Sequence, residues 1–353
     1  MTLTTKTTSD SGESPQDSGG NGDRGAAPFL DLACGDGASL LIETARIRHK
    51  RWDNIIRKLE YCRTWSKGAT DPYCMMVLGE SGTGKSAVVA AYMQRHKVSE
   101  EEEGQRIPVL KVDAPAVPTM KSLAESMLFA LGDPLADKGT LNARTDRLIR
   151  LLKRCGVEII IVDEFQHFLE HESAKSLQST SDWLKNLITQ SRLPVVLVGL
   201  EKCGKILESY PQLDRRFMAQ AYLKPFRWHE AKREEFFHFL SELDDQLPLR
   251  EKSGLSDPEM AQRLFFASKG LVSSLMKIVR QGAHIAIELN EPRITAKSLS
   301  KAYKLTTARR IKPDPFLGPL PEIDETWGKM QVILTNPPFN TSVKSKVAPK
   351  QAA

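Results

Sequence analysis

Long apolar runs, paired cysteines and a strong excess of one charge are all missing from this 353-residue chain. No stretch of about 18 consecutive apolar residues occurs, and the polar N-terminus lacks the apolar segment that a signal peptide carries. The five cysteines are scattered and form no CxxC pair, which favours neither a disulfide framework nor a zinc site. We therefore expect a soluble cytoplasmic protein with no membrane span and with ordinary, mostly buried thiols.

The net charge is only +6, from 50 Lys+Arg and 44 Asp+Glu. A total this small permits nucleic-acid binding without arguing for it, so the position of the charges matters more than their sum. The hydrophobic content of 41% is ample for a large core. A chain of this length suggests roughly two domains.

Composition divides the chain into four parts. Residues 1–28 are rich in Ser, Thr and Gly and have no aromatic side chain, so we predict a disordered N-terminal tail. Residues 39–226 are predicted to form one or two amphipathic helices and then an α/β core, and residues 227–306 a helical domain. Residues 307–353 contain recurring prolines and a basic, polar end, and we predict a C-terminal tail.

Short apolar runs alternate with helical stretches in the predicted core. The runs predict five strands, at 74–78, 107–112, 158–162, 194–199 and 219–223. Helical spacing fills the gaps at 85–96, 119–131, 144–154 and 181–191, and then recurs alone at 229–245, 258–268, 271–289 and 295–306. Strand and helix in alternation predict a parallel sheet covered on both faces, so the fold class is a three-layer α/β core followed by a small all-α domain.

The strongest motif follows the first predicted strand and precedes a helix. It reads Gly79, Glu80, Ser81, Gly82, Thr83, Gly84, Lys85, Ser86. Glycines let successive backbone N–H groups turn toward phosphate oxygens, and the N-terminus of the following helix adds partial positive charge. Lys85 would reach the β- and γ-phosphates and Ser86 would ligate Mg²⁺, so we predict a P-loop that binds ATP.

A second motif supports the first. The apolar run 159–162 ends in Asp163 and Glu164. Two carboxylates at a strand end can divide the work of hydrolysis: Asp163 would hold Mg²⁺ through water, and Glu164 would be the base for the attacking water. A small-molecule kinase has no need of the second acid, so the pair favours ATP hydrolysis.

The order of these motifs resembles that of AAA+ ATPases, and most closely the TniB/TnsC transposition ATPases, including those of CRISPR-associated transposons, with MuB more distant. The resemblance covers about residues 40–304. It rests on the segments GESGTGKS, CGVEIIIVDEFQHF, LPVVLVGLEKC, YPQLDRRF, YLKPFRW and KGLVSSL. It implies an ATPase that oligomerises with ATP on double-stranded DNA as a ring or filament, binds DNA without sequence preference, and recruits a transposase alongside a small targeting protein of the TniQ kind.

The resemblance also implies an arginine finger, supplied by a neighbouring subunit to the γ-phosphate. Arg216 matches that position, with Arg215 as the adjacent candidate; the alternative is a pair of solvated arginines. Two departures from the usual pattern favour slow hydrolysis that acts as a switch. The fourth strand ends in Gly199 and Leu200 where many relatives have a polar residue that positions water. Ser273 and Ser274 stand where many have a sensing arginine.

DNA contacts in the relatives come from the region between the second strand and the strand that carries the two acids. Here that region contains Lys121, Lys138, Thr140 and Arg144. Lysine and hydroxyl groups can follow a phosphate backbone without reading bases. The alternative for each of these residues is a solvated helix face.

A rival interpretation comes from two short segments. Residues 29–37, FLDLACGDG, and residues 332–339, VILTNPPF, resemble motifs of S-adenosylmethionine-dependent amino-methyltransferases. Such a fold needs further strands between and after these motifs, and few residues follow the second. The preferred function is therefore the DNA-bound transposition ATPase. The alternatives are a helicase-loader-like ATPase of the same superfamily and, from another class, a DNA methyltransferase.

Overall fold

The computed structural model describes residues 36–44, 47, 49–102, 104–170, 174–204, 214–217, 219–307 and 314–323. The predicted 1–28 tail and the NPPF segment lie outside these residues. So does the DLACGDG segment, apart from Asp36 and Gly37 in the first turn of a helix.

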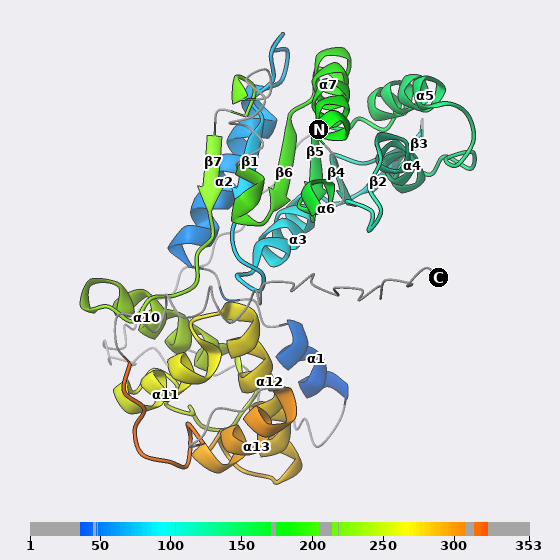
Figure 1. The fold of residues 1–353 in the computed structure, drawn as a ribbon. Helices are drawn as coiled ribbons and strands as arrows, with labels where there is room; N and C mark the ends of the chain where they lie inside the picture. Colours follow the sequence, from blue (N-terminus) through cyan, green and yellow to red (C-terminus); the bar gives the residue numbers. More distant parts are fainter. Residues whose placement is uncertain are drawn as a thin grey trace, which may run out of the picture.

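A five-stranded parallel sheet forms the centre of the upper lobe in Figure 1. The strand order is β4-β5-β6-β1-β7, in which β1 carries the P-loop and β5 the two acids. The strands are β1 (Met75–Leu78), β4 (Val109–Asp113), β5 (Ile159–Asp163), β6 (Val195–Gly199) and β7 (Ala219–Tyr222). All five predicted strands are therefore present, each within two residues of its predicted bounds.

Helices cover both faces of this sheet, as the strand–helix alternation predicts. Successive strand residues point to opposite faces, so Met76 and Leu78 of β1 pack on one side and Met75 and Val77 on the other. The first side is covered by α4 (Met120–Ala130), α5 (Leu141–Arg154), the short α6 (His167–Glu170) and α7 (Ala174–Ser191). The second is covered by α2 (Lys50–Trp65) and α3 (Lys85–Arg95). Burial of β5 on both faces explains why residues 159–162 form an unbroken apolar run in the sequence.

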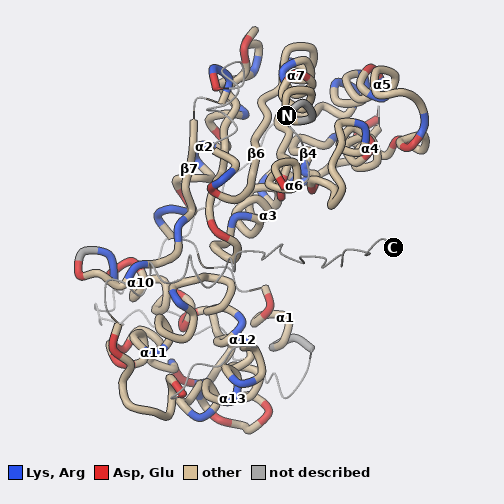
Figure 2. Tube along the Cα trace, in the orientation of Figure 1, with Lys and Arg blue, Asp and Glu red and all other residues tan. Residues whose placement is uncertain are grey.

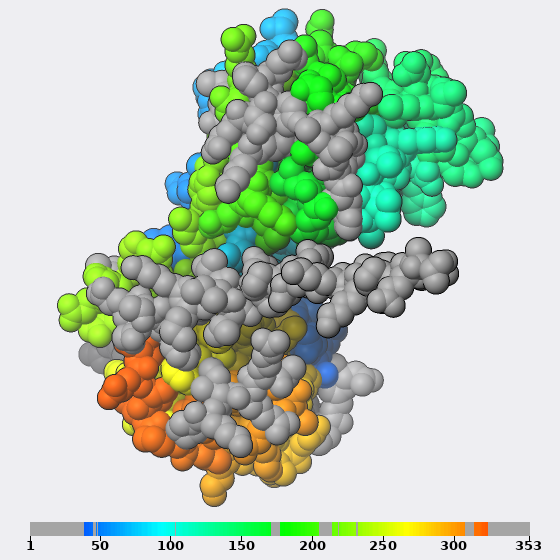
Figure 3. All heavy atoms as spheres, in the orientation of Figure 1, coloured from blue at the N-terminus to red at the C-terminus, as the bar shows by residue number. Residues whose placement is uncertain are grey.

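A separate helical lobe, here called the lid, follows the sheet (Figure 1). Its helices are α10 (Glu230–Gln246), α11 (Pro258–Ser268), α12 (Val272–Glu288) and α13 (Ala296–Thr306). They surround their own apolar cluster, which includes Phe236, Leu264 and Val279. The four predicted helices of the second domain are confirmed, and the space-filling view shows this lobe below the one that contains the sheet (Figure 3).

The lid also takes segments from outside its predicted limits. Helix α1 (Asp36–Thr44) packs against α12, and its Ile42 is buried in the lid cluster, although the sequence places it with the core. Residues 314–323 belong to the lid as well, because Phe316 is buried against Tyr303 and Arg263 donates to the carbonyl oxygens of Pro315 and Gly318. This part of the predicted C-terminal tail is therefore packed structure.

Three local features differ from the sequence-based expectation. Residues 99–106 contain a small antiparallel hairpin, β2 (Ser99–Glu101) and β3 (Gly104–Arg106), which is not among the five predicted strands. A 3-10 turn, η1 (Glu201–Gly204), follows β6. Helix α7 begins at Ala174, seven residues before its predicted start at Ser181.

In the described part of the chain, no helix is long and apolar enough to cross a membrane, and the four described cysteines are free and buried.

Candidate nucleotide site

The P-loop connects the end of β1 to the start of α3. It lies at the carboxyl ends of the strands, on the side of the sheet that faces the lid (Figure 1). Its backbone enters the left-handed region at Gly82 and Gly84, with φ values of +81° and +99°. Gly84 is also the N-cap of α3. Glycine tolerates this conformation at little cost, so the loop can turn its N–H groups toward a common point at the N-terminus of α3.

Lys85 is buried at the first position of α3. Its Nζ donates to the carbonyl oxygens of Gly79 and Glu80, both at 2.8 Å. Burial lowers the pKa of the Lys85 ammonium, while the nearby carboxylates of Glu164 and Asp163 oppose that shift. The ammonium therefore lies inside the loop, next to the acids of β5, and bonds to carbonyl oxygens that phosphate oxygens could replace.

Asp163 and Glu164 lie at the end of β5, which is separated from β1 by β6. Asp163 is buried, and its Oδ1 accepts a hydrogen bond from the backbone N–H of Glu164 at 2.8 Å. Glu164 has a φ of +55°, which is uncommon for a residue with a side chain. The strand end therefore turns sharply after Asp163, and this turn sets the direction of the Glu164 side chain.

Gln166 is a further polar residue beside Glu164, and the sequence motifs do not point to it. Its Nε2 donates to Oε2 of Glu164, and its Oε1 accepts from the backbone N–H of Leu200 at 3.3 Å. Gln166 is thus bonded both to the predicted base and to the end of β6. The signal that was available is the absence of a side chain at Gly199, which leaves space for a residue from elsewhere.

The lid contacts the P-loop directly through the N-terminus of α12. The backbone N–H of Ser273 donates to the carbonyl oxygen of Gly82 at 2.9 Å, and a Cβ on Gly82 would collide with Oγ of Ser273. Gly270, with a φ of +70°, accepts from the N–H of Phe226 at 2.9 Å and so holds this end of the lid near the end of β7. A rotation of the lid would therefore disturb the P-loop itself.

The residues present fit Mg²⁺ bound together with phosphate. Ser86 is exposed in the first turn of α3, and Asp163 supplies a carboxylate at the end of β5. Among the described residues, no three His, Cys, Asp or Glu side chains gather into a metal site. Mg²⁺ commonly takes one or two protein ligands and completes its shell with waters and substrate phosphates, which suits this arrangement.

Arg216 lies just before β7, at the end of the sheet opposite the P-loop. Its guanidinium donates to Asp71 Oδ1 at 2.8 Å and to Thr189 Oγ1 at 3.2 Å, whereas Arg215 is exposed. The two ends of a parallel sheet face opposite directions. Arg216 is therefore remote from the P-loop of its own chain.

The predicted DNA-contact residues separate into two groups. Lys121, Lys138 and Thr140 are exposed on α4 and on the loop before α5. Arg144 is only 3% exposed, and its guanidinium bonds to Glu125 and to the carbonyl oxygens of Lys121, Asp137 and Gly139. As a correction to the prediction, Arg144 in this structure fixes the loop to α4 and is not free for a phosphate.

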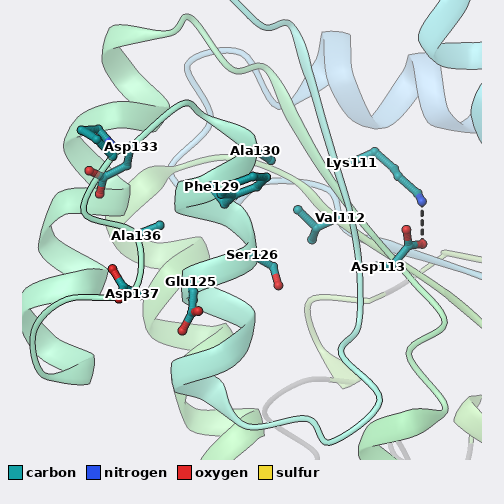
Figure 4. Close-up of a pocket in the computed structure, with 11 residues that line it drawn as sticks. Lys111, Val112, Asp113, Glu125, Ser126, Phe129, Ala130, Asp133, Ala136 and Asp137 are labelled. Carbon is teal, nitrogen blue, oxygen red and sulfur yellow. Dashed lines mark hydrogen bonds and ion pairs between the residues drawn. The ribbon is translucent and has the colours of Figure 1, made fainter.

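Acidic side chains lie close to the exposed lysines. Figure 2 shows Lys/Arg and Asp/Glu residues intermixed along α4, α5 and the loop between them. A hollow beside the edge strand β4 is lined by Glu125, Asp133 and Asp137, by the exposed Phe129, and by the Lys111–Asp113 ion pair that Figure 4 marks with a dashed line. Two strands, β5 and β6, lie between β4 and β1, and the hollow contains no residue of the P-loop.

The basic segment 49–58 contacts both lobes. Arg51 donates to Glu235 of α10 and, at 2.8 Å, to the carbonyl oxygen of Lys224. His49 is buried between the rings of Trp52, Phe226 and Phe239. The apolar residues of α2 pack on the core, and Arg51 links the core to the lid.

Comparisons with known proteins agree with this fold. The chain is similar in fold to Cdc6p of Pyrobaculum aerophilum (TM-score 0.58, 13% identity, covering 77% of this chain and 72% of that one). It is also similar to the Aeropyrum pernix Orc1 protein, solved in complex with DNA (TM-score 0.55, 16% identity, 76% and 69%). These likenesses establish the P-loop AAA+ fold, and no match was found among proteins of curated function. Residues 40–229, more than half of the chain, match the family described as bacterial TniB protein, and the chain belongs to that family.

Proposed function

We propose that this chain binds ATP and Mg²⁺, assembles on double-stranded DNA as a ring or helical filament, and recruits a transposase, as a TniB/TnsC-type regulator of DNA transposition. One observation carries most of the argument: the buried Lys85, the acids Asp163 and Glu164, and the N-terminus of α12 meet at a single P-loop. The TniB family match supports the transposition context.

The roles of the side chains follow from the geometry. The loop N–H groups and Lys85 would bind the β- and γ-phosphates, and Ser86 and Asp163 would hold Mg²⁺, which neutralises phosphate charge when bound. Glu164 would take the proton of the attacking water. Because α12 bonds to Gly82, filling the loop with phosphate would bias the position of the lid, so hydrolysis could release an assembled state.

Sequence-independent DNA binding is proposed for the exposed face that bears Lys121, Lys138 and Thr140. A few phosphate contacts per subunit suffice when subunits repeat along a duplex, since effective concentration multiplies weak contacts. We further propose partners of the kind that the TniB/TnsC resemblance implies: a transposase, a small TniQ-like targeting protein, and other copies of this chain. Delivery to the target by an RNA-guided complex would be one form of this system.

The alternative is a helicase-loader-like ATPase on DNA, which the fold similarity to Orc1 and Cdc6p supports. It would use the same nucleotide site. The two functions differ in their output, because only a transposition regulator should stimulate strand transfer by a transposase from the same element. Stimulation that depends on ATP favours the first function, and its absence with the matched transposase favours the second.

The central test compares Lys85→Ala with Lys97→Ala, which removes an exposed lysine beyond α3. We expect Lys85→Ala to lose nucleotide binding and ATP-dependent assembly on duplex DNA, while Lys97→Ala keeps both. Electron microscopy with a slowly hydrolysed ATP analogue measures the assembly. For Glu164→Gln we expect ATP-bound complexes that persist on DNA. Assemblies of normal length from Lys85→Ala would contradict the nucleotide switch, and rapid release by Glu164→Gln would contradict the assigned base.

A further inference from the structure

The end of β6 has no side chain that could position water. Gly199 is the last residue of the strand, and Leu200 follows it. A Cβ at position 199 would lie 2.8 Å from Sγ of Cys203, closer than real Cβ atoms come, and 3.0 Å from Oε1 of Gln166, which is a tight contact. The space beside the strand end is therefore already taken, and the polar group in it is the amide of Gln166.

The orientation of this amide follows from its two partners. The backbone N–H of Leu200 can only donate, so the atom 3.3 Å from it is the amide oxygen. The –NH₂ group then faces Oε2 of Glu164, to which it donates. An ionised carboxylate can only accept hydrogen bonds, so both contacts require the same orientation of the amide.

Burial makes these contacts specific. Gln166 is 7% exposed, and a buried amide without partners would cost free energy. The backbone around it is held as well, since the N–H of Phe165 donates to the carbonyl oxygen of Val198 at 2.9 Å. The amide thus has a narrow choice of rotamers, and the Glu164 carboxylate bonded to it is restricted in turn.

The same strand end is connected to the P-loop. The carbonyl oxygen of Gly199 accepts from the backbone N–H of Gly79 at 3.1 Å. A short path therefore runs from Glu164 through Gln166 to the end of β6 and on to the first residue of the phosphate-binding loop. Movement of the loop as phosphate binds would therefore shift the Gln166 amide and, through it, the Glu164 carboxylate.

We propose that Gln166 is the positioning residue for Glu164 and that it supplies, from the segment after β5, the polar group that β6 lacks. This inference rests on the proposed ATPase function. In hydrolysis, Glu164 accepts a proton from water as the water oxygen bonds to the γ-phosphorus. The bond from that phosphorus to the bridging oxygen breaks, and ADP and phosphate leave. Gln166 holds the Glu164 carboxylate in line for that proton transfer.

The test uses Gln166→Met in the full chain, because methionine keeps the length and packing of the side chain but removes both hydrogen bonds. We expect kcat to fall roughly ten- to a hundred-fold, with the affinity for a fluorescent ATP analogue unchanged. The matched control is Gln178→Met on α7, whose amide donates to Asp182 on the surface. That variant should hydrolyse ATP at the wild-type rate.

A second comparison separates positioning from direct contact with water or nucleotide. If Gln166 acts through Glu164, the double variant Glu164→Ala/Gln166→Met should hydrolyse ATP as slowly as Glu164→Ala alone in single-turnover measurements. A further drop in rate in the double variant would overturn the positioning role. Nucleotide affinity that falls in parallel with the rate in Gln166→Met would also overturn it, because that result indicates a damaged fold.

The experiment distinguishes failure of the inference from failure of the proposed function. If the wild-type chain hydrolyses ATP, Lys85→Ala does not, and Gln166→Met matches the wild type, only the claim about Gln166 is wrong. If neither the wild type nor Lys85→Ala binds or hydrolyses ATP, the proposed function is wrong and the claim about Gln166 falls with it.

Discussion

Burial decides what each charged residue of this protein can do. Lys85, Arg144 and His49 are all at least nine-tenths buried, but their side chains have different partners. Lys85 keeps acids close to it, and Arg144 satisfies its guanidinium with carbonyl oxygens and Glu125. His49 lies among aromatic rings, and its Nδ1 has no hydrogen-bond partner among the residues that the structure describes. A buried group without full compensation favours its neutral form.

His49 makes stability depend on pH. Desolvation by burial lowers its pKa from 6.5 to about 4, against the opposing attraction of Glu235, whose Oε1 is 3.8 Å from Nδ1, and of Asp53, while Arg51 adds to the lowering. In the unfolded chain His49 is protonated below about pH 6.5, whereas in the folded chain it is protonated only below about pH 4. The stabilisation is therefore complete above pH 6.5 and is lost as the pH falls toward 4, by roughly 2 kcal/mol at pH 5.

Urea denaturation of the wild type and of His49→Leu at about pH 7.5 and pH 5 measures this effect, because other titrating groups cancel in the difference. We expect the stability advantage of the wild type over His49→Leu to shrink at the lower pH. The control is His238→Leu on α10, where the side chain is 68% exposed. An advantage of the wild type that stays constant between the two pH values would show that His49 is not buried in neutral form.

At the scale of elements, α4 and α5 present the face proposed for DNA. Thr140 is the N-cap of α5, and its Oγ1 accepts from the N–H of Ala143 at 3.3 Å. Arg144 then joins α5 to the carbonyl oxygen of Lys121 at the start of α4. The exposed Lys121 and Lys138 are thus brought together by groups whose own role is structural, and a substitution at Thr140 or Arg144 would confuse folding with binding.

Charge reversal at Lys121 or Lys138 should weaken DNA binding equally on all sequences. It should also lower the salt slope by roughly one for each phosphate that the protein no longer neutralises. Fluorescence anisotropy with duplexes of unrelated sequence, over a range of salt concentrations, measures both. The matched control for Lys138→Glu is Lys252→Glu on the lid, because each lysine is exposed and forms an ion pair with an aspartate. A loss of affinity that varies strongly with sequence would contradict binding to the DNA backbone.

The cap at Thr140 has a stability effect of its own. Thr140→Asn keeps a good cap while removing the hydroxyl, whereas Thr140→Ala should cost about 1 kcal/mol of stability. Urea denaturation of the two variants measures the difference. Equal stability of Thr140→Ala and the wild type would show that the cap does not stabilise α5.

At the scale of the whole molecule, the parallel sheet separates two halves of the proposed active site. The P-loop, Asp163 and Glu164 lie at the carboxyl ends of the strands, and Arg216 lies before β7 at the opposite end. A subunit with this geometry cannot bring Arg216 to its own nucleotide. Head-to-tail stacking would place it against the site of the next subunit, in the kind of heterologous contact that forms rings or helical filaments.

Mixing two inactive variants tests this arrangement. Arg216→Ala has an intact base, and Glu164→Gln has an intact arginine, so contacts between the two variants should restore part of the DNA-stimulated ATPase activity. The measurement is phosphate release as a function of the mixing ratio, with a maximum near equal amounts. Arg215→Ala and Asp71→Asn are the controls, the second because it removes only the charge that pairs with Arg216 within the subunit. No gain on mixing would contradict an arginine supplied in trans.

The sequence alone predicted the parts of this protein that depend on local patterns. All five strands are where periodicity places them, because strands buried on both faces require continuous apolar runs. The loop 79–86 connects a strand to a helix, as its motif predicts, and it turns at Gly82 and Gly84. The helix boundaries were less accurate where the signal was weak. Helix α7 begins at Ala174 and not at the predicted residue 181, and α5 begins at Leu141 and not at the predicted residue 144.

Only the tertiary structure decided which neighbours the same residues have. Ile42 lies in the lid, Arg144 is buried, and Gln166 bonds to Glu164, and each depends on a partner that is distant in the chain or on a turn that no pattern encodes. Gly199 illustrates the reason. In the sequence it only lacks a polar side chain, whereas in the fold the space beside it is occupied by the amide of Gln166. Periodicity records which face of an element is apolar, but the contacts between elements arise only when the elements pack.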